Sequence, residues 1–190
     1  METKKAIGIG IGLFALYGIF HKKKSDGFQL SKFYTVEDLT NSDTARDLGI
    51  SEQFSTPPND ILNNAKYYAD KLLDPITTKL GRPMYVESWY RSPALNEAVG
   101  GVDDSLHMKA LAADLKYKKF GHNAAKDIVK AVISEALPFH KMILTGPEND
   151  PTTIHISLKR SGNAYQPYYK GADGSYTKVP IDVLYSRLNV

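Results

Sequence analysis

The sequence predicts an α+β fold, with a small antiparallel sheet, flanking helices and a membrane helix at the N-terminus. Hydrophobic residues make up 42% of the 190 residues and charged residues 24%, which is normal for one folded domain with an ordinary core. Segments with helical spacing of apolar residues precede and interrupt short runs that are rich in β-branched and aromatic residues. Helices arranged in this way around a few strands favour α+β.

The N-terminal segment, residues 6–20, is apolar and uncharged, and basic residues flank it on both sides. As a helix it would rise about 22 Å, which is short of a bilayer core of about 30 Å. A signal-peptide core would have this length, but no small-x-small cleavage site follows. A buried core helix would be weakened by three alternating glycines. We therefore predict an uncleaved, single-pass anchor over residues 1–24, with lysines that snorkel and an orientation that the flanks leave open.

Residues 25–32 are predicted to form a linker, which two short helices follow. Thr35 and Ser42 each offer a capping oxygen, and acidic residues follow each of them within the first helical turn. Gly49 is expected to end the second of these helices. The folded part is therefore expected to begin with helices.

The apolar residues between positions 61 and 80 follow helical spacing and predict a longer helix that packs into the core. Asn59 is expected to cap this helix, Gly81 to end it, and Pro75 to bend or restart it. Further along the chain, strands are predicted at residues 84–90, 110–115, 141–144 and 153–158. Helices are predicted at residues 93–99 and 122–137, a hairpin around the turn at 171–174, and a terminal helix from Ile181.

The chain contains no cysteine, which excludes a disulfide framework, a thiol nucleophile and a thiolate zinc finger. Any bound metal must therefore sit on His, Asp or Glu. The net charge of +3 is mild, and part of it comes from the lysines at 22–24 beside the apolar segment. No clustered arginine face with interleaved aromatic residues occurs, so we expect no nucleic-acid partner.

Three residues are candidates for a metal site with one open position, which a zinc enzyme needs for water. His107 and Asp114 are too far apart in the sequence for neighbouring turns of one helix, but a loop His and a strand Asp can converge. His155 alternates with Ile154 and Ile156 along a predicted strand, so its side chain points to the opposite face. A lone histidine beside a strand is more often a hydrogen-bonded core residue, so spacing alone leaves both interpretations open.

Several short sequence motifs occur together and in a fixed order along the chain. They are FYTVEDL at 33–39, SWYRSP at 88–93, VGG at 99–101, SLHMKALAAD at 105–114 and HISL at 155–158. As a set they resemble the zinc D-alanyl-D-alanine carboxypeptidase family, which also includes phage L-alanyl-D-glutamate endopeptidases and the vancomycin-resistance dipeptidases. The resemblance covers residues 33–158 and implies a zinc peptidase that acts on peptidoglycan peptides.

The resemblance also implies roles for individual residues. His107, Asp114 and His155 match the zinc ligands of the family, with Zn²⁺ as the cofactor. Arg91 matches an arginine that holds a substrate carboxylate or carbonyl, a task that suits a planar bidentate donor. Ser105 matches a serine that contributes a substrate-side hydrogen bond. Bound zinc would polarise the scissile carbonyl and lower the pKa of its water towards 7.

The sequence departs from the family pattern at the general base, which the family places shortly before the second zinc-binding histidine. Thr145 and Thr152 stand near the expected positions, and neither is an acid. Glu148 and Asp150 lie in the intervening loop and are the candidate catalytic residues, with Glu148 preferred. The alternative for both is an ordinary acidic turn, because Asn-Asp-Pro is strong turn chemistry.

A second departure is Trp89, which stands where relatives usually have glycine. A residue of this size beside Arg91 is expected to narrow the substrate groove or to stack against it. Such a change would affect substrate preference more than the fold.

The sequence thus predicts a zinc peptidase domain over residues 33–160, with a C-terminal extension at 161–190 packed on it. The expected enzyme is a D,D-carboxypeptidase or endopeptidase that hydrolyses peptidoglycan peptides and contacts the membrane through residues 6–20. Its peptidase domain would face the cell wall or travel in a lipid-containing virion, where a role in phage lysis would fit. The rival hypothesis is a weakly active or inactive zinc-binding wall or virion protein, which the missing acid favours.

Overall fold

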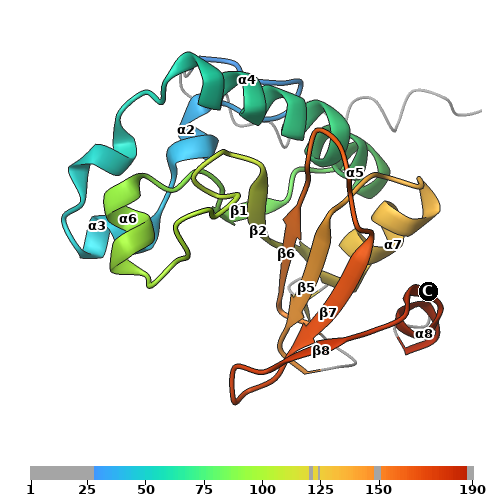
Figure 1. The fold of residues 1–190 in the computed structure, drawn as a ribbon. Helices are drawn as coiled ribbons and strands as arrows, with labels where there is room; N and C mark the ends of the chain where they lie inside the picture. Colours follow the sequence, from blue (N-terminus) through green and yellow to red (C-terminus); the bar gives the residue numbers. More distant parts are fainter. Residues whose placement is uncertain (1–27, 120–121, 124, 148–150, 188–190) are drawn as a thin grey trace, which may run out of the picture.

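The computed structural model describes residues 28–119, 122–123, 125–147 and 151–187, and in these residues it shows a sheet covered by helices (Figure 1). This arrangement confirms the predicted α+β class. The predicted membrane helix at residues 6–20 lies outside the described residues. Among the residues that are described, no helix is long and apolar enough to cross a membrane.

Two capped helices open the described chain, as predicted. The Thr35 side chain accepts from the Asp38 N–H and the Asp38 carboxylate accepts from the Thr35 N–H, which together form a capping box. The Ser42 side chain accepts from the Ala45 N–H at 3.1 Å. The helices of the described chain are α2 (Val36–Thr40), α3 (Asp43–Asp47), the 3-10 helix η1 (Ser51–Phe54), α4 (Asn59–Tyr68), the π-helical turn η2 (Ala69–Leu73), α5 (Asp74–Leu80), α6 (Pro93–Ala98), α7 (Ala125–Ser134) and α8 (Ile181–Arg187).

The long predicted helix is interrupted near Pro75, as expected. The π-helical turn η2 ends one residue before α5, and Pro75 lies in the first turn of α5. Proline cannot donate the usual backbone bond to the residue four positions earlier, which explains the widened turn before it. Gly81 ends α5 with a φ of 78°, the left-handed conformation of a helix stop. The predicted cap was wrong, because Asn59 is the first helical residue and Pro58 occupies the cap position without a side-chain bond.

The main sheet has six strands in the order β1-β2-β6-β5-β7-β8. The strands are β1 (Tyr85–Ser88), β2 (Ala112–Lys116), β6 (Thr153–Ser157), β5 (Lys141–Thr145), β7 (Gln166–Lys170) and β8 (Tyr176–Lys178). All neighbours are antiparallel except β5 and β7, so the prediction of an antiparallel sheet was wrong for this pair. The chain leaves β6 at the end where β5 starts and passes directly to the far side of β5, so β7 must run parallel to it.

A short second sheet changes the start of α7. Strands β3 (Lys118–Lys119) and β4 (His122–Asn123) pair with one another, and α7 begins only at Ala125. The helix predicted over residues 122–137 is therefore shorter at both ends. The predicted hairpin and terminal helix are present, as β7–β8 and as α8.

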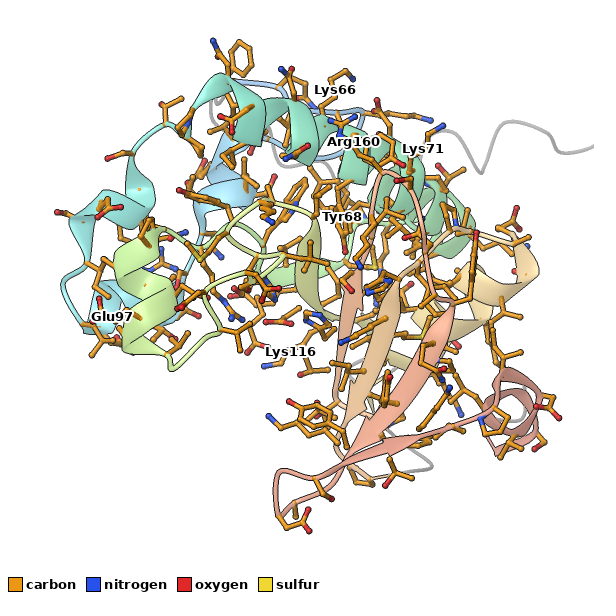
Figure 2. All side chains as sticks on the ribbon, viewed as in Figure 1. Lys66, Tyr68, Lys71, Glu97, Lys116 and Arg160 are labelled. Atoms are coloured by element: carbon orange, nitrogen blue, oxygen red, sulfur yellow. The ribbon has the colours of Figure 1, made fainter. Side chains whose placement is uncertain are left out.

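The sheet has one buried face and one open face. Along β5, Met142 and Leu144 are fully buried against the core, while Lys141, Ile143 and Thr145 alternate towards the open face. Tyr68 points from the helical layer towards the sheet, where its hydroxyl donates to the carbonyl of Ile156 at 2.8 Å (Figure 2). This bond ties the helices to β6, the strand that carries His155.

Replacing Tyr68 with Phe is expected to destabilise the metal-free chain by about 1 kcal/mol, because one buried hydrogen bond to β6 is lost. Urea denaturation would measure the change. The matched control is Tyr67→Phe, since the Tyr67 ring stacks beneath Arg160 and its hydroxyl has no hydrogen bond among the described residues. Equal unfolding midpoints for the two variants would contradict the role of this bond.

Candidate metal centre

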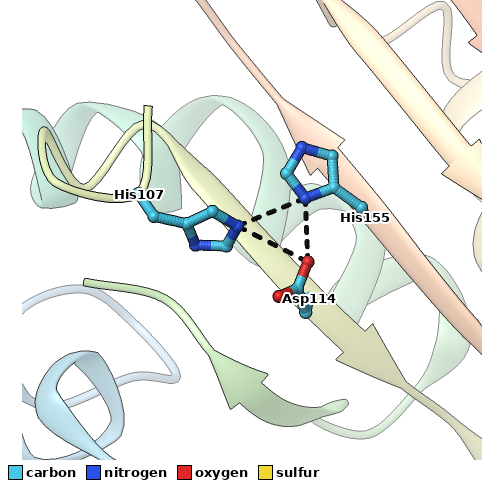
Figure 3. A group of neighbouring side chains, drawn as sticks. All are labelled: His107, Asp114 and His155. Carbon is cyan, nitrogen blue, oxygen red and sulfur yellow. Dashed lines mark hydrogen bonds and ion pairs between the residues drawn. The ribbon is translucent and has the colours of Figure 1, made fainter. Parts of the chain in front are cut away.

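Three side chains meet on the open face of the sheet (Figure 3). His107 comes from the loop between α6 and β2, Asp114 from β2 and His155 from β6. Asp114 and His155 are direct partners across the two strands, so the register of β2 and β6 places them side by side. His155 Nδ1 lies 2.8 Å from Asp114 Oδ1, and His107 Nε2 lies 3.2 Å from His155 Nδ1 and 3.5 Å from Asp114 Oδ1. The structure thus brings together the three residues proposed from the sequence.

Trp89 orients His107 and the loop that carries it. The Trp89 carbonyl lies 2.8 Å from His107 Nδ1 and can only accept, so Nδ1 carries the proton and Nε2 directs its lone pair at the cluster. The Trp89 indole N–H donates to the carbonyl of Ala110, which has a φ of 54° at the end of the same loop. Trp89 is fully buried. The expectation that it narrows the groove was wrong, because its ring packs into the core and supports the loop from beneath.

Arg91 holds the second oxygen of Asp114. Its Nη2 donates to Asp114 Oδ2 at 2.8 Å, and its Nε donates to the Ser88 hydroxyl at 3.1 Å. The backbone around Arg91 is fixed by Gln53, a fully buried side chain that donates to the Tyr90 carbonyl and accepts from the Ser92 N–H. Arg91 is therefore a rigid neighbour of the cluster, and it leaves Asp114 Oδ1 to face the two histidines.

The electrostatics of the cluster favour a neutral His107 and a charged Asp114. Burial lowers the pKa of His107, although hydrogen bonding and charge from Asp114 oppose this. Burial would raise the pKa of Asp114, but hydrogen bonds with His107 and His155 hold it well below its ordinary value. A metal site needs these protonation states, because only a neutral imidazole and an ionised carboxylate donate lone pairs to a cation.

The geometry of the donors fits zinc. Ligand atoms at about 2.0–2.1 Å from a tetrahedral zinc ion lie about 3.3 Å from one another. The separations within the cluster, 2.8, 3.2 and 3.5 Å, bracket that value. Two imidazoles and one carboxylate are also a donor set used by catalytic zinc sites, which keep the fourth position open.

The cluster opens into a groove of about 1030 Å³. Arg91 and Ser105 line this groove, as do the three cluster residues, so the structure also brings the predicted substrate-binding residues to the same place. The predicted catalytic residues Glu148 and Asp150 lie outside the described residues. Of the described acids that line the groove besides Asp114, Glu87 forms an ion pair with Lys116, while Asp104 belongs to the loop before His107.

Sequence reasoning missed a set of basic and aromatic residues that line the same groove. They are Lys109, Lys141, Lys159, Lys170 and Tyr176. Lys109 lies two residues after His107 in the same loop, whereas the spacing of the other four carries no signal, because they come together only through the order of the strands. The alternation of exposed and buried residues along β5 could have identified Lys141, but not its neighbours.

Two histidines and an aspartate on the open face of the sheet, beside a groove and a fixed arginine, form a group that could hold a metal ion. A family model described as Peptidase M15 matches residues 33–156, which is more than half of the chain. The chain therefore belongs to the Peptidase M15 family of zinc D-Ala-D-Ala carboxypeptidases. Membership indicates a zinc peptidase that acts on peptidoglycan-type substrates. A search of curated proteins found no match.

We expect the chain to bind one zinc ion and His155→Ala to weaken this binding by more than about 100-fold, because loss of a neighbour of a zinc ligand already weakens binding by about 10–100-fold. Competition against a colorimetric chelator would measure the affinity. His140→Ala is the matched control, since His140 lines the same groove but is not part of the cluster. Equal zinc affinity in both variants would contradict the assignment.

The metal-free chain is expected to lose stability as the pH falls below about 6.5, the ordinary pKa of histidine. The folded chain holds the pKa of His107 below that of the unfolded chain, so the unfolded chain binds more protons in this range. Burial, followed by Lys159 and Lys141, lowers the pKa of the more exposed His140 in the same direction. Chemical denaturation between pH 5 and 7 would measure how the free energy of unfolding depends on pH. This dependence should be weaker in His107→Gln than in His140→Gln. A wild-type profile that is already flat would contradict this account.

Proposed function

We propose that this chain is a zinc-dependent D,D-carboxypeptidase or endopeptidase that hydrolyses peptidoglycan stem or cross-bridge peptides. The observation that carries the proposal is the convergence of His107, Asp114 and His155 beside Arg91 at an open groove. The Peptidase M15 match over residues 33–156 supports the same reaction class.

The site residues would have different roles in metal binding and substrate binding. His107, Asp114 and His155 would hold zinc, which when bound supplies Lewis-acid activation of the scissile carbonyl and of water. Arg91 uses Nε and Nη2 within the protein, and among the described residues nothing accepts from its Nη1. The two N–H groups of Nη1 are left to bind a substrate carboxylate or carbonyl, and Ser105 would add a hydrogen bond from the groove wall.

We propose Glu148 as the general base, with Asp150 as the second choice. Both belong to the loop between Thr145 and Thr153, which are direct partners at the ends of β5 and β6 and line the groove. His155 lies two residues after Thr153 on β6, so the two ends of this loop join the sheet close to the cluster. A carboxylate carried by the loop would have a short path to a water molecule beside the zinc ligands.

Purified full-length chain loaded with zinc is expected to release amines from peptidoglycan, and Glu148→Gln to lower kcat by at least about 100-fold. Asp150→Asn is the matched control and should retain most of the activity. Zinc affinity would be measured for each variant, because a base that is not a ligand leaves it unchanged. Full activity in both variants would exclude the loop as the source of the base.

The second candidate function is a zinc-binding wall or virion protein with weak or no hydrolysis. The observation that favours it is the make-up of the cluster. Among the described residues only His107, Asp114 and His155 converge there, and threonines, not acids, stand at positions 145 and 152. Stoichiometric zinc without release of amines at any pH between about 6 and 9 would support this function over the peptidase.

We also propose that residues 6–20 anchor the chain in a membrane, with the peptidase domain facing the cell wall or carried in a lipid-containing virion. The uncharged apolar run and its basic flanks support this proposal. Full-length chain is expected to float with lipid vesicles in a density gradient, whereas Leu13→Lys should weaken flotation because a charge in the apolar run opposes insertion. Equal flotation of both proteins would contradict the anchor.

A further inference from the structure

The open face of the sheet continues well beyond the metal cluster. The family model ends at residue 156, yet β7 and β8 follow and extend the sheet on the side of β5 away from the cluster (Figure 1). The register places Asp114, His155 and Ile143 in one row, and Tyr168 continues this row on β7. Neighbouring strands lie about 4.8 Å apart, so this added surface starts within about 10 Å of His155.

The added surface is basic. Lys141 on β5 and Lys170 on β7 line the same groove as the cluster, and Lys159 lies beyond the end of β6. None of these three lysines has an ion pair among the described residues. Burial lowers the pKa of His140 first, and the charges of Lys159 and Lys141 lower it further, which indicates a positive potential at this end of the groove.

The acids of the described groove lie elsewhere or are already engaged. Glu87 on β1 pairs with Lys116, and Asp104 belongs to the loop before His107 on the other side of the cluster. On the hairpin itself, the Asp173 carboxylate accepts from the Ser175 N–H at 2.9 Å within the turn. Lys170 stacks its ammonium over the ring of Tyr176, with 5.7 Å to the ring centroid, so Tyr176 holds this charge at the groove.

From this arrangement we infer that the β5–β7–β8 surface is a second substrate site, in which Lys141 and Lys170 bind free carboxylates on the part of the peptide remote from the scissile bond. The inference rests on the proposed function for the identity of the substrate. It differs from the role of Arg91, which lies at the cluster. The two lysines stand on neighbouring strands, four residues apart in register, and therefore suit an extended peptide with more than one acidic group.

The charge complementarity favours a peptide carboxylate over a neutral chain. Each exposed lysine–carboxylate pair is expected to raise affinity by about threefold, so two pairs should raise it by about tenfold. A neutral version of the same peptide would keep its backbone contacts but lose this gain in affinity. We therefore expect the chain to bind stem peptides with free side-chain carboxylates more tightly than stem peptides without them.

Calorimetric titration of the metal-free full-length chain tests the inference with two probes, a stem-type peptide with free side-chain carboxylates and the same peptide with those groups amidated. The free acid is expected to bind about tenfold more tightly to the wild-type chain. In the double variant Lys141→Gln, Lys170→Gln this preference should fall below about twofold. Lys71→Gln is the control, since Lys71 lies on the helical layer away from the groove (Figure 2).

Equal affinity of both peptides for the wild-type chain, or an unchanged preference in the double variant, would overturn the inference. Because binding is measured without metal, the outcome does not depend on hydrolysis. A chain that prefers the free acid but cleaves neither peptide when zinc is present would keep the second site and lose the proposed function. A chain that cleaves both with equal KM and kcat would keep the function and lose the second site.

Discussion

The pairing of β2 with β6 is the constraint on which the site depends. It sets Asp114 directly opposite His155 on the open face, and a slip of one residue would turn one of the two side chains into the core. The neighbouring contacts hold this register in place. Tyr68 bonds to the carbonyl of Ile156 from the buried side, and Arg91 fixes Asp114 from the open side.

Buried side chains beneath the site support its loops. Gln53 in η1 fixes the backbone around Arg91, and the buried Trp89 bonds to His107 and to the end of its loop. These supports are buried and hydrogen-bonded, so they hold the donors in place before any cation arrives. Lys141 and Lys170, which line the groove, are in contrast exposed and charged, which leaves them available for a substrate.

Local chemistry made much of the fold predictable, whereas the arrangement of strands did not. The caps at Thr35 and Ser42 and the stop at Gly81 depend only on nearby backbone groups, so the sequence reveals them. The alternation around His155 likewise indicated the open face. The parallel pair β5–β7 depends on how the chain crosses the sheet, and the basic groove depends on that order. The burial of Trp89 could not be predicted from the sequence around it. A tryptophan two residues before Arg91 has the same sequence neighbours whether its ring faces the groove or the core.

The central claim is that His107, Asp114 and His155 bind one zinc ion and leave a position open. X-ray absorption at the zinc edge of the zinc-loaded, full-length chain tests it most directly. We expect a shell of about four nitrogen and oxygen atoms at about 2.0–2.1 Å, with two imidazole rings, and the loss of one ring in His155→Ala. A shell with fewer than two imidazoles, or one that His155→Ala leaves unchanged, would contradict it.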